Sequence, residues 1–309
     1  MIKIRGLKKE YAAKVALRGL DADVAPGEVC GLIGSNGAGK TTLLRILSTV
    51  LRPTAGEVSI AGYDLQYEAH QIRSLIGYMP DSLSTYEEIR VDTFLEFFAH
   101  LYDLPRETVT QTIGDILSLV DLGPLRHSLI ETLSLGSRQR LSLGRVLLHN
   151  PEVLLLDEPV SGLDPRARVE MRALLKELGS MGKSVLISSH VLTDLVDLCD
   201  RLLIIEQGEK VFSGSFQELE ELVAADSQIS IGLSSRLEEA QRFLSDQRYT
   251  KSVSLSGDST LLLTLSDSEI PVERVTAALA EAGYSITEFT PLHLDLEEAF
   301  LKITQGIVS

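Results

Sequence analysis

The stretch that decides the fold of this 309-residue chain is Gly34-Ser35-Asn36-Gly37-Ala38-Gly39-Lys40-Thr41. It fits the phosphate-loop pattern G-x-x-x-x-G-K-[ST] in full, and it stands between an apolar run, Val29–Ile33, and a helical pattern. Glycines let the backbone curl so that its N–H groups point at phosphate oxygens, and a helix start adds a positive dipole end. We expect the loop, through Thr42, to cradle nucleotide phosphates. Lys40 would hold the β- and γ-phosphates, and Thr41 would bind Mg²⁺.

A second stretch downstream ends in two acidic residues, Val153-Leu154-Leu155-Leu156-Asp157-Glu158. Its apolar part predicts a buried strand, so both carboxylates fall at a strand end. Asp157 is placed to hold Mg²⁺ through its water shell, and Glu158 to accept a proton from an attacking water. Alone, such a pair is often a plain surface turn. After a phosphate loop, it indicates nucleotide hydrolysis.

From the start to about residue 220, β-type apolar runs alternate with helical patterns, which predicts an α/β layered domain. The short apolar runs are typical of strands buried on both faces of a parallel sheet. The predicted strands are Glu28–Ile33, Val153–Leu156, Ser184–Ser188 and Arg201–Ile205, and the predicted helices are Lys40–Leu51, Pro165–Leu178 and Leu192–Cys199. Between residues 82 and 132 the pattern is nearly all helix, over Val91–Leu101 and Arg106–Val120. We interpret this segment as a helical insert.

Residues 221–309 have another pattern, which predicts a small accessory domain. Its order of elements is β-α-β-β-α-β, which indicates a ferredoxin-like α+β unit closed by a short helix. The predicted elements are Gln228–Leu233, Arg236–Leu244, Lys251–Leu255, Thr260–Leu265, Pro271–Ala282, Ser285–Thr290 and Leu294–Ile303.

Composition excludes some classes of function. The formal net charge is −15, whereas nucleic-acid backbones are bound by Lys and Arg, so we expect no nucleic-acid partner. No apolar run approaches the roughly 18–20 residues that a membrane-spanning helix needs. The beginning, MIKIRGLKKEY, lacks the apolar core of a secretory signal. With two cysteines, Cys30 and Cys199, the default expectation is a reduced cytosolic compartment.

Four further motifs complete a resemblance to one family. Leu133-Ser134-Leu135-Gly136-Ser137-Arg138-Gln139-Arg140 is similar to the signature LSGGQ and the basic helix start that follows it. Ser161-Gly162-Leu163-Asp164 resembles the D-loop, His190 the switch histidine, and Tyr11 the aromatic residue that stacks on adenine. In this order, and over about residues 1–215, the set resembles the ATPase subunits of ABC transporters.

The resemblance implies a mechanism that needs two subunits. They would face each other head to tail, with each ATP between one phosphate loop and the opposite signature. Ser134 and the backbone N–H of Gly136 would then donate to the γ-phosphate. His190 would hold the γ-phosphate and the attacking water in line beside Glu158. Tyr11 would stack on adenine, although a tyrosine near a β-edge is also commonly a packing residue.

Two departures from the family pattern bear on this expectation. The position that normally carries the glutamine of the glutamine loop is Asp81, in Gly77-Tyr78-Met79-Pro80-Asp81. A carboxylate still accepts from metal-bound water, so we hypothesise that Asp81 keeps a role near Mg²⁺. The signature has Leu135 for Gly and Ser137 for Gln. Its phosphate-binding groups remain, so we expect activity to survive.

The resemblance also indicates a function. Leu294–Thr304 is similar to the closing segment of ATPases that serve ABC-2-type exporters, although as a helix it could simply dock the small domain. We expect an ATP-binding and ATP-hydrolysing subunit that powers export by separate membrane subunits. These would dock on the helical insert at the cytoplasmic face of the cell membrane. Two alternatives stay open, a soluble ABC ATPase that acts on ribosomes or DNA and a regulatory subunit that uses ATP only to dimerise.

Overall fold

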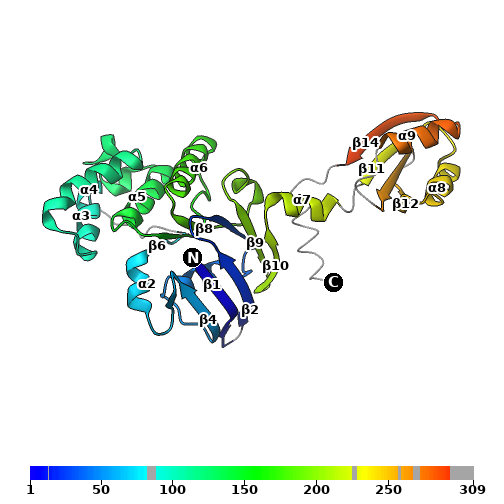
Figure 1. Ribbon diagram of the computed structural model, residues 1–309. Coiled ribbons are helices and arrows are strands. Elements are labelled where there is room, and N and C mark those ends of the chain that lie inside the picture. The colour runs from blue at the N-terminus through cyan, green and yellow to red at the C-terminus, as the bar shows by residue number, and fades with distance from the viewer. Residues whose placement is uncertain (13, 82–87, 225–227, 257–258, 267–271, 293–309) are drawn as a thin grey trace. The chain divides into compact units, whose positions relative to one another are not determined.

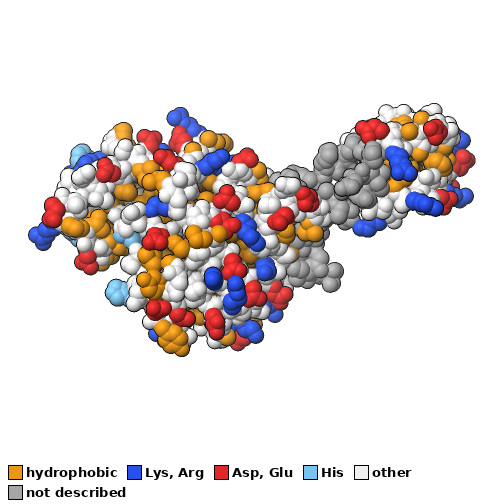
Figure 2. All heavy atoms as spheres, in the orientation of Figure 1, with side chains coloured by type: hydrophobic (Ala, Val, Ile, Leu, Met, Phe, Trp, Pro, Cys, Tyr) orange, Lys and Arg blue, Asp and Glu red, His pale blue; other side chains and the backbone are white. Residues whose placement is uncertain are grey.

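The computed structural model describes residues 1–12, 14–81, 88–224, 228–256, 259–266 and 272–292 (Figure 1). The chain forms two compact units, Met1–Ser215 and Phe216–Ser309. The division expected near residue 220 falls within a helix, α7 (Phe216–Ala224). Figure 2 shows acidic and basic side chains interspersed over the visible face of the first unit. Among the described residues, no helix has the length and apolar character needed to cross a bilayer.

The first unit is organised around a six-stranded sheet in the order β10-β9-β3-β8-β7-β6. Five of the strands run parallel, and β10 pairs antiparallel with β9 at one edge. Each of the four predicted strands is confirmed within a residue. The strands are β3 (Val29–Ile33), β6 (Ile76–Met79), β7 (Val153–Leu156), β8 (Ser184–Ser189), β9 (Arg201–Glu206) and β10 (Glu209–Gly214). Parallel sheets bind ligands beyond the carboxyl ends of their strands, so this edge is where a site is expected.

Three helices follow strands or loops at that edge. They are α1 (Lys40–Leu47), α5 (Leu135–Leu147) and α6 (Pro165–Ser180). α1 ends four residues before its predicted end. The helix predicted over Leu192–Cys199 is wrong, because only Leu192–Asp194 forms a 3₁₀ turn and the following residues are turns. The apolar residues that suggested a helix there are buried as a loop instead, with Leu195 fully inside.

A second, antiparallel sheet was not expected from the sequence. Its order is β2-β1-β4-β5, formed by β1 (Ile2–Tyr11), β2 (Lys14–Val24), β4 (Ala55–Ile60) and β5 (Tyr63–Asp64). One apolar cluster joins residues of this sheet, of α1 and of the main sheet, so α1 is held between the two sheets. The short helix α2 (Ala69–Leu75) leads from β5 into β6.

The helical insert is confirmed over its described part. α3 (Val91–Leu101) and α4 (Arg106–Leu119) lie together at one end of the unit in Figure 1. The 3₁₀ turns Gly123–Leu125 and Ile130–Thr132 then lead into α5. Residues 82–87 of the predicted insert lie outside the described residues.

The second unit has the predicted order of elements and a sheet in the order β12-β13-β11-β14. This arrangement is ferredoxin-like, and α8 and α9 bury their apolar faces on one side of the sheet. Its elements are β11 (Gln228–Leu233), α8 (Leu237–Ser245), β12 (Thr250–Leu255), β13 (Thr260–Leu265), α9 (Val272–Glu281) and β14 (Ile286–Leu292). The closing helix predicted over Leu294–Ile303 lies outside the described residues.

Both cysteines are free and buried in the first unit, Cys30 at 1% exposure and Cys199 at 9%. Burial raises the pKa of the Cys30 thiol to about 12 and that of Cys199 well above its usual value. Neither thiol therefore has appreciable thiolate character at neutral pH.

Candidate nucleotide-binding and hydrolytic site

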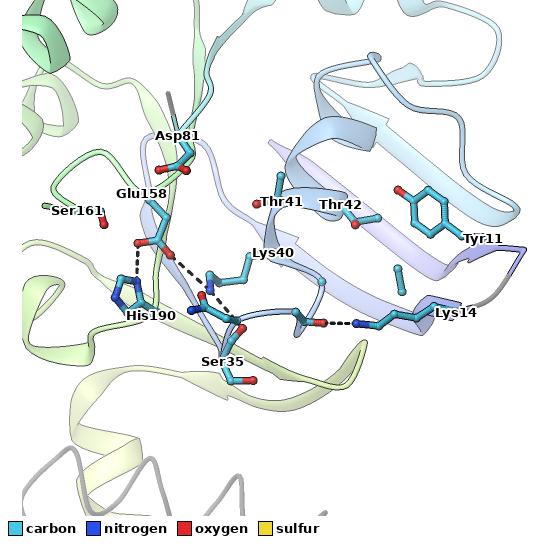
Figure 3. Close-up of a pocket in the computed structure, with 14 residues that line it drawn as sticks. Tyr11, Lys14, Ser35, Lys40, Thr41, Thr42, Asp81, Glu158, Ser161 and His190 are labelled. Carbon is cyan, nitrogen blue, oxygen red and sulfur yellow. Dashed lines mark hydrogen bonds and ion pairs between the residues drawn. The ribbon is translucent and has the colours of Figure 1, made fainter. Parts of the chain in front are cut away.

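A cavity of about 430 Å³ opens at the carboxyl edge of the main sheet (Figure 3). Tyr11 and His190 lie toward opposite ends of it, with the phosphate loop between them. The predicted site residues that line it are Tyr11, Ser35, Asn36, Gly37, Gly39, Lys40, Thr41, Thr42, Asp81, Glu158 and His190. Of the other predicted residues, Gly34, Ala38, Asp157, Ser134 and Gly136 do not line the cavity. Lys14 and Ala16 also line it and were not predicted, as does Ser161, which the sequence assigned to the D-loop without a role in the site.

Neighbouring backbone fixes the shape of the phosphate loop. Gly39 has φ +115°, and a Cβ there would meet the carbonyl oxygen of Ala16 at 2.7 Å. A Cβ on Gly34 would meet the carbonyl oxygen of Ile205 at only 2.3 Å. The loop therefore needs glycine at both positions because β2 and β9 press on it from behind. Its place at the end of β3 follows from the packing of both sheets.

Lys40 reaches back along its own loop. Its side chain is 6% exposed, and its ammonium donates to the carbonyl of Gly34 at 2.7 Å and lies 3.4 Å from Oε1 of Glu158. A buried ammonium next to a curl of backbone N–H groups is a strong site for phosphate. Glu158 shares that ammonium, so a bound phosphate would compete with the carboxylate for it.

A buried serine joins the two acids at the end of β7. The hydroxyl of Ser188 donates to Oδ1 of Asp157 at 2.7 Å and accepts from the backbone N–H of Glu158 at 2.9 Å. Thr41 Oγ1 also donates to Oδ1 of Asp157, at 3.3 Å. Glu158 itself has φ +51°, an uncommon conformation for a residue other than glycine, of the kind that clusters at functional sites. Ser188 thus ties the carboxylate of Asp157 to the backbone of Glu158.

His190 and Glu158 contact each other directly. Nδ1 of His190 lies 2.9 Å from Oε2 of Glu158, and the other oxygen of that carboxylate faces Lys40. Figure 3 shows Glu158 between the lysine and the histidine. The carboxylate is mostly buried and the imidazole more exposed, so a water beside them would have an acceptor within reach on the cavity side.

Tyr11 lies at the other end of the cavity and is half-exposed, which leaves ring surface for a base to stack on. The ammonium of Lys9 is 5.2 Å from its ring centroid and also donates to the carbonyl of Arg52 at 2.9 Å. Lys14 pairs with Tyr11 across the β1–β2 hairpin. The sequence prediction missed Lys14 because it did not recognise this hairpin, which places Lys14 beside Tyr11.

Ser134 and Gly136 lie at the start of α5 and outside the cavity. Ser134 caps the helix, accepting from the backbone N–H of Ser137 at 3.2 Å, and its hydroxyl also donates to that of Ser137 at 3.1 Å. Ser134 is exposed, and so is Leu135. Ser137, which stands where Gln is usual, therefore helps to hold the cap.

Asp81 lines the cavity near Glu158 (Figure 3). Its backbone carbonyl accepts from the side-chain amide of Gln139 at 3.4 Å, which ties this residue to α5. The structure thus brings the replaced glutamine-loop position to the hydrolytic end of the site.

Replacing Asp81 with alanine is expected to lower the ATPase rate several-fold and to raise the Mg²⁺ concentration needed for half-maximal rate. The reason is that a carboxylate in this position would accept hydrogen bonds from metal-bound water. The measurement is a Mg²⁺ titration of steady-state ATPase activity, with Asp115→Ala on the insert helix α4 as the matched control. An unchanged rate and an unchanged Mg²⁺ dependence in Asp81→Ala would exclude the role.

Comparison with known proteins places this geometry in a family. Residues 17–161 match the family model described as ABC transporter. A daunorubicin resistance ATP-binding protein of Streptomyces coeruleorubidus is 34% identical over 305 residues, which are 98% of this chain and 95% of that protein. A Nod factor export ATP-binding protein of Rhizobium sp. strain N33 is 30% identical over 303 residues, 98% of this chain and 96% of that protein. A solved ATP-binding subunit of an ABC transporter is 27% identical with a TM-score of 0.65, over 72% of this chain and 93% of that one.

Proposed function

The chain belongs to the family of ABC transporter ATP-binding subunits, and on that premise we propose that it powers export through separate membrane-spanning subunits of the ABC-2 type. It binds and hydrolyses ATP to drive transport. The relatives named for daunorubicin resistance and Nod factor export, each aligned over nearly all of this chain, support export. The alternatives that act on ribosomes or DNA, or only regulate, find no support among these relatives.

The proposal of ATP hydrolysis depends on the contacts of Glu158, whose carboxylate lies between Lys40 and His190 in the cavity. Lys40 would bind the terminal phosphates, and the attacking water would lie on the far side of the γ-phosphate. Glu158 would take a proton from that water as its oxygen bonds to the γ-phosphorus and the bond to the β–γ bridging oxygen breaks. His190 would hold the carboxylate and the γ-phosphate in line. ADP and phosphate would then be released.

Mg²⁺ fits the residues below the loop. Oδ2 of Asp157 is buried without a hydrogen-bond partner, and the whole residue is 1% exposed. An unpaired buried carboxylate oxygen costs stability unless a cation or a donor reaches it. Beside the hydroxyl of Thr41, it is a site for a hard cation with oxygen ligands. Mg²⁺ bound there would neutralise charge on the phosphates, while Asp157 and Thr41 would hold it in place.

The cavity is half of a site, and we propose that a second ATPase subunit completes it head to tail. Ser134 and Gly136 point to solvent or to α6 and do not reach the cavity of their own chain. The first turn of α5 offers N–H groups and a dipole end suited to a γ-phosphate on another subunit. Closure of two such halves would also exclude water from the developing charge.

For the membrane subunits we propose a groove of about 260 Å³ between the end of α1, β6 and the helical insert. Val50 lies in it with 69% exposure, and Tyr78 and Tyr102 line it together with two arginines, Arg73 and Arg145. Phe97 and Leu101 of α3 are also exposed apolar residues. Exposed apolar residues around a groove mark a protein interaction site more often than chance scatter does. A cytoplasmic helix of a membrane subunit would bury them.

Substituting Val50 with aspartate is expected to reduce co-purification with a six-span membrane protein from detergent-solubilised membranes by about tenfold or more, because a charged carboxylate would replace the exposed apolar side chain that the partner helix would bury. ATP binding by the isolated chain should not change. Val169→Asp is the matched control, since Val169 of α6 is an equally exposed valine at 65%. Equal recovery of the membrane protein with both variants would show that the groove is not the docking site. If the unaltered chain recovered no membrane protein, the result would count against a transport role.

A further inference from the structure

Lys14 is a cation in the nucleotide cavity that neither the phosphate-loop pattern nor the family motifs assign. It begins β2 and pairs with Tyr11 of β1 in the hairpin register. Side chains that pair directly across two strands share one face of the sheet, with Cβ atoms about 5 Å apart. Lys14 therefore faces the cavity for the same reason as Tyr11, and both line it.

From that position the side chain reaches the phosphate loop. The ammonium donates to the carbonyl of Gly37 at 3.3 Å, a long hydrogen bond (Figure 3). Among the described residues no carboxylate forms an ion pair with Lys14, and the side chain is exposed to the cavity and to solvent. An ammonium whose partner is a single distant carbonyl loses little when a better acceptor arrives.

The charges around the cavity favour a phosphate as that acceptor. Asp81 and Glu158 bring two carboxylates to the hydrolytic end, and Glu158 already shares the ammonium of Lys40. A polyphosphate brings several further negative charges into the same space. Lys14 supplies positive charge at the outer side of the loop, away from both carboxylates, as Figure 3 shows.

We propose that Lys14 is a nucleotide-binding residue, whose ammonium leaves the carbonyl of Gly37 to bind a phosphate oxygen of ATP. This inference rests on the proposed function, because it assumes that the cavity holds ATP. Lys14 adds to affinity and not to the chemical step, since it lies apart from Glu158 and His190. Lys14 would thus bind ATP between its base, which Tyr11 would contact, and its terminal phosphates, which Lys40 would contact.

The test measures ATP affinity of the full chain by displacement of a fluorescent ATP analogue. Lys14→Met keeps most of the stem and removes the charge, and Lys14→Arg restores a charge. Lys3→Met is the matched control, since Lys3 is an exposed lysine of the same strand pair outside the cavity. We expect Lys14→Met to weaken ATP binding about three- to tenfold, as for a partly exposed charge contact. Lys14→Arg and Lys3→Met should bind like the unaltered chain.

Two further measurements separate a phosphate contact from its rivals. A charge contact should weaken as salt rises, so the difference between Lys14→Met and the unaltered chain should shrink in high salt. The fold loss should be the same for ATP, 2′-deoxy-ATP and 3′-deoxy-ATP. If the loss disappeared with either deoxy nucleotide, Lys14 would contact a ribose hydroxyl and the proposal would be overturned. If Lys14→Met and the unaltered chain bound ATP equally well, Lys14 would make no contact with the nucleotide and the proposal would also be overturned. If the unaltered chain bound no ATP, the proposed function would fail first.

Discussion

Glu158→Gln is expected to lower kcat for ATP hydrolysis by about 10²–10⁴-fold, which is the range that a positioned general base contributes. The amide keeps the shape of the side chain and its contact distance to His190, but it cannot take a proton from water. The affinity for ATP, in contrast, should rise. Removing the carboxylate frees the ammonium of Lys40, 3.4 Å away, for phosphate and removes a negative charge beside it.

Steady-state turnover and equilibrium binding of ATP together check this expectation. Size-exclusion chromatography should show dimers that persist in ATP and Mg²⁺ with Glu158→Gln but are transient in the unaltered chain, because unhydrolysed ATP would keep the two halves together. Glu177→Gln, on the exposed face of α6, is the control. A fall in kcat of less than about fivefold, far below the general-base range, would mean that another group accepts the proton.

Lys40→Ala is expected to weaken ATP binding by about 10²-fold, from the loss of charge-assisted hydrogen bonds in a buried site. The cause is twofold. The phosphates lose their buried cation, and the carboxylate of Glu158 is left facing them without its partner. ATP hydrolysis should fall below detection at ATP concentrations that saturate the unaltered chain.

Calorimetric titration with ATP measures this loss, with Lys176→Ala on the surface of α6 as the matched control. Thermal unfolding without nucleotide checks that the variant is folded, and we expect a lower melting temperature, because the mostly buried carboxylate of Glu158 loses the ammonium 3.4 Å away. Binding within a few-fold of the unaltered chain would show that backbone N–H groups alone hold the phosphates, and the role given to Lys40 would be wrong.

The parts of the fold that the sequence predicts are those with a strong local pattern. The strand Val153–Leu156 is a continuous apolar run, and Val91–Leu101 has helical periodicity, and both occur as predicted. The antiparallel sheet was not predicted because Ile2–Tyr11 mixes charged with apolar residues and has several irregular pairings. One of its two partner strands, β4, begins only at Ala55, and local periodicity does not report such a distant pairing.

In the candidate site, too, some residues could be predicted from the sequence and others could not. The loop residues, Asp157 and Glu158 are found by motif because their chemistry constrains their spacing. Ser188, which links the carboxylate of Asp157 to the backbone of Glu158, was part of a predicted strand, and nothing in its neighbours marks its hydroxyl as important. Leu192–Cys199 had helical spacing but forms only a 3₁₀ turn and a loop, because the burial of Leu195 and Leu198 satisfies the same apolar pattern without an α-helix. These features depend on contacts between distant segments.

The burial of Cys30 and Cys199 has a practical consequence for watching this protein work. Thiol-directed dyes and spin labels react with thiolates on the surface, and both native thiols are enclosed and held protonated. A single surface cysteine introduced by mutation would therefore carry a label on the otherwise natural sequence. A pair of such labels, one on each copy, would report in real time the approach and separation of two cassettes during each round of turnover.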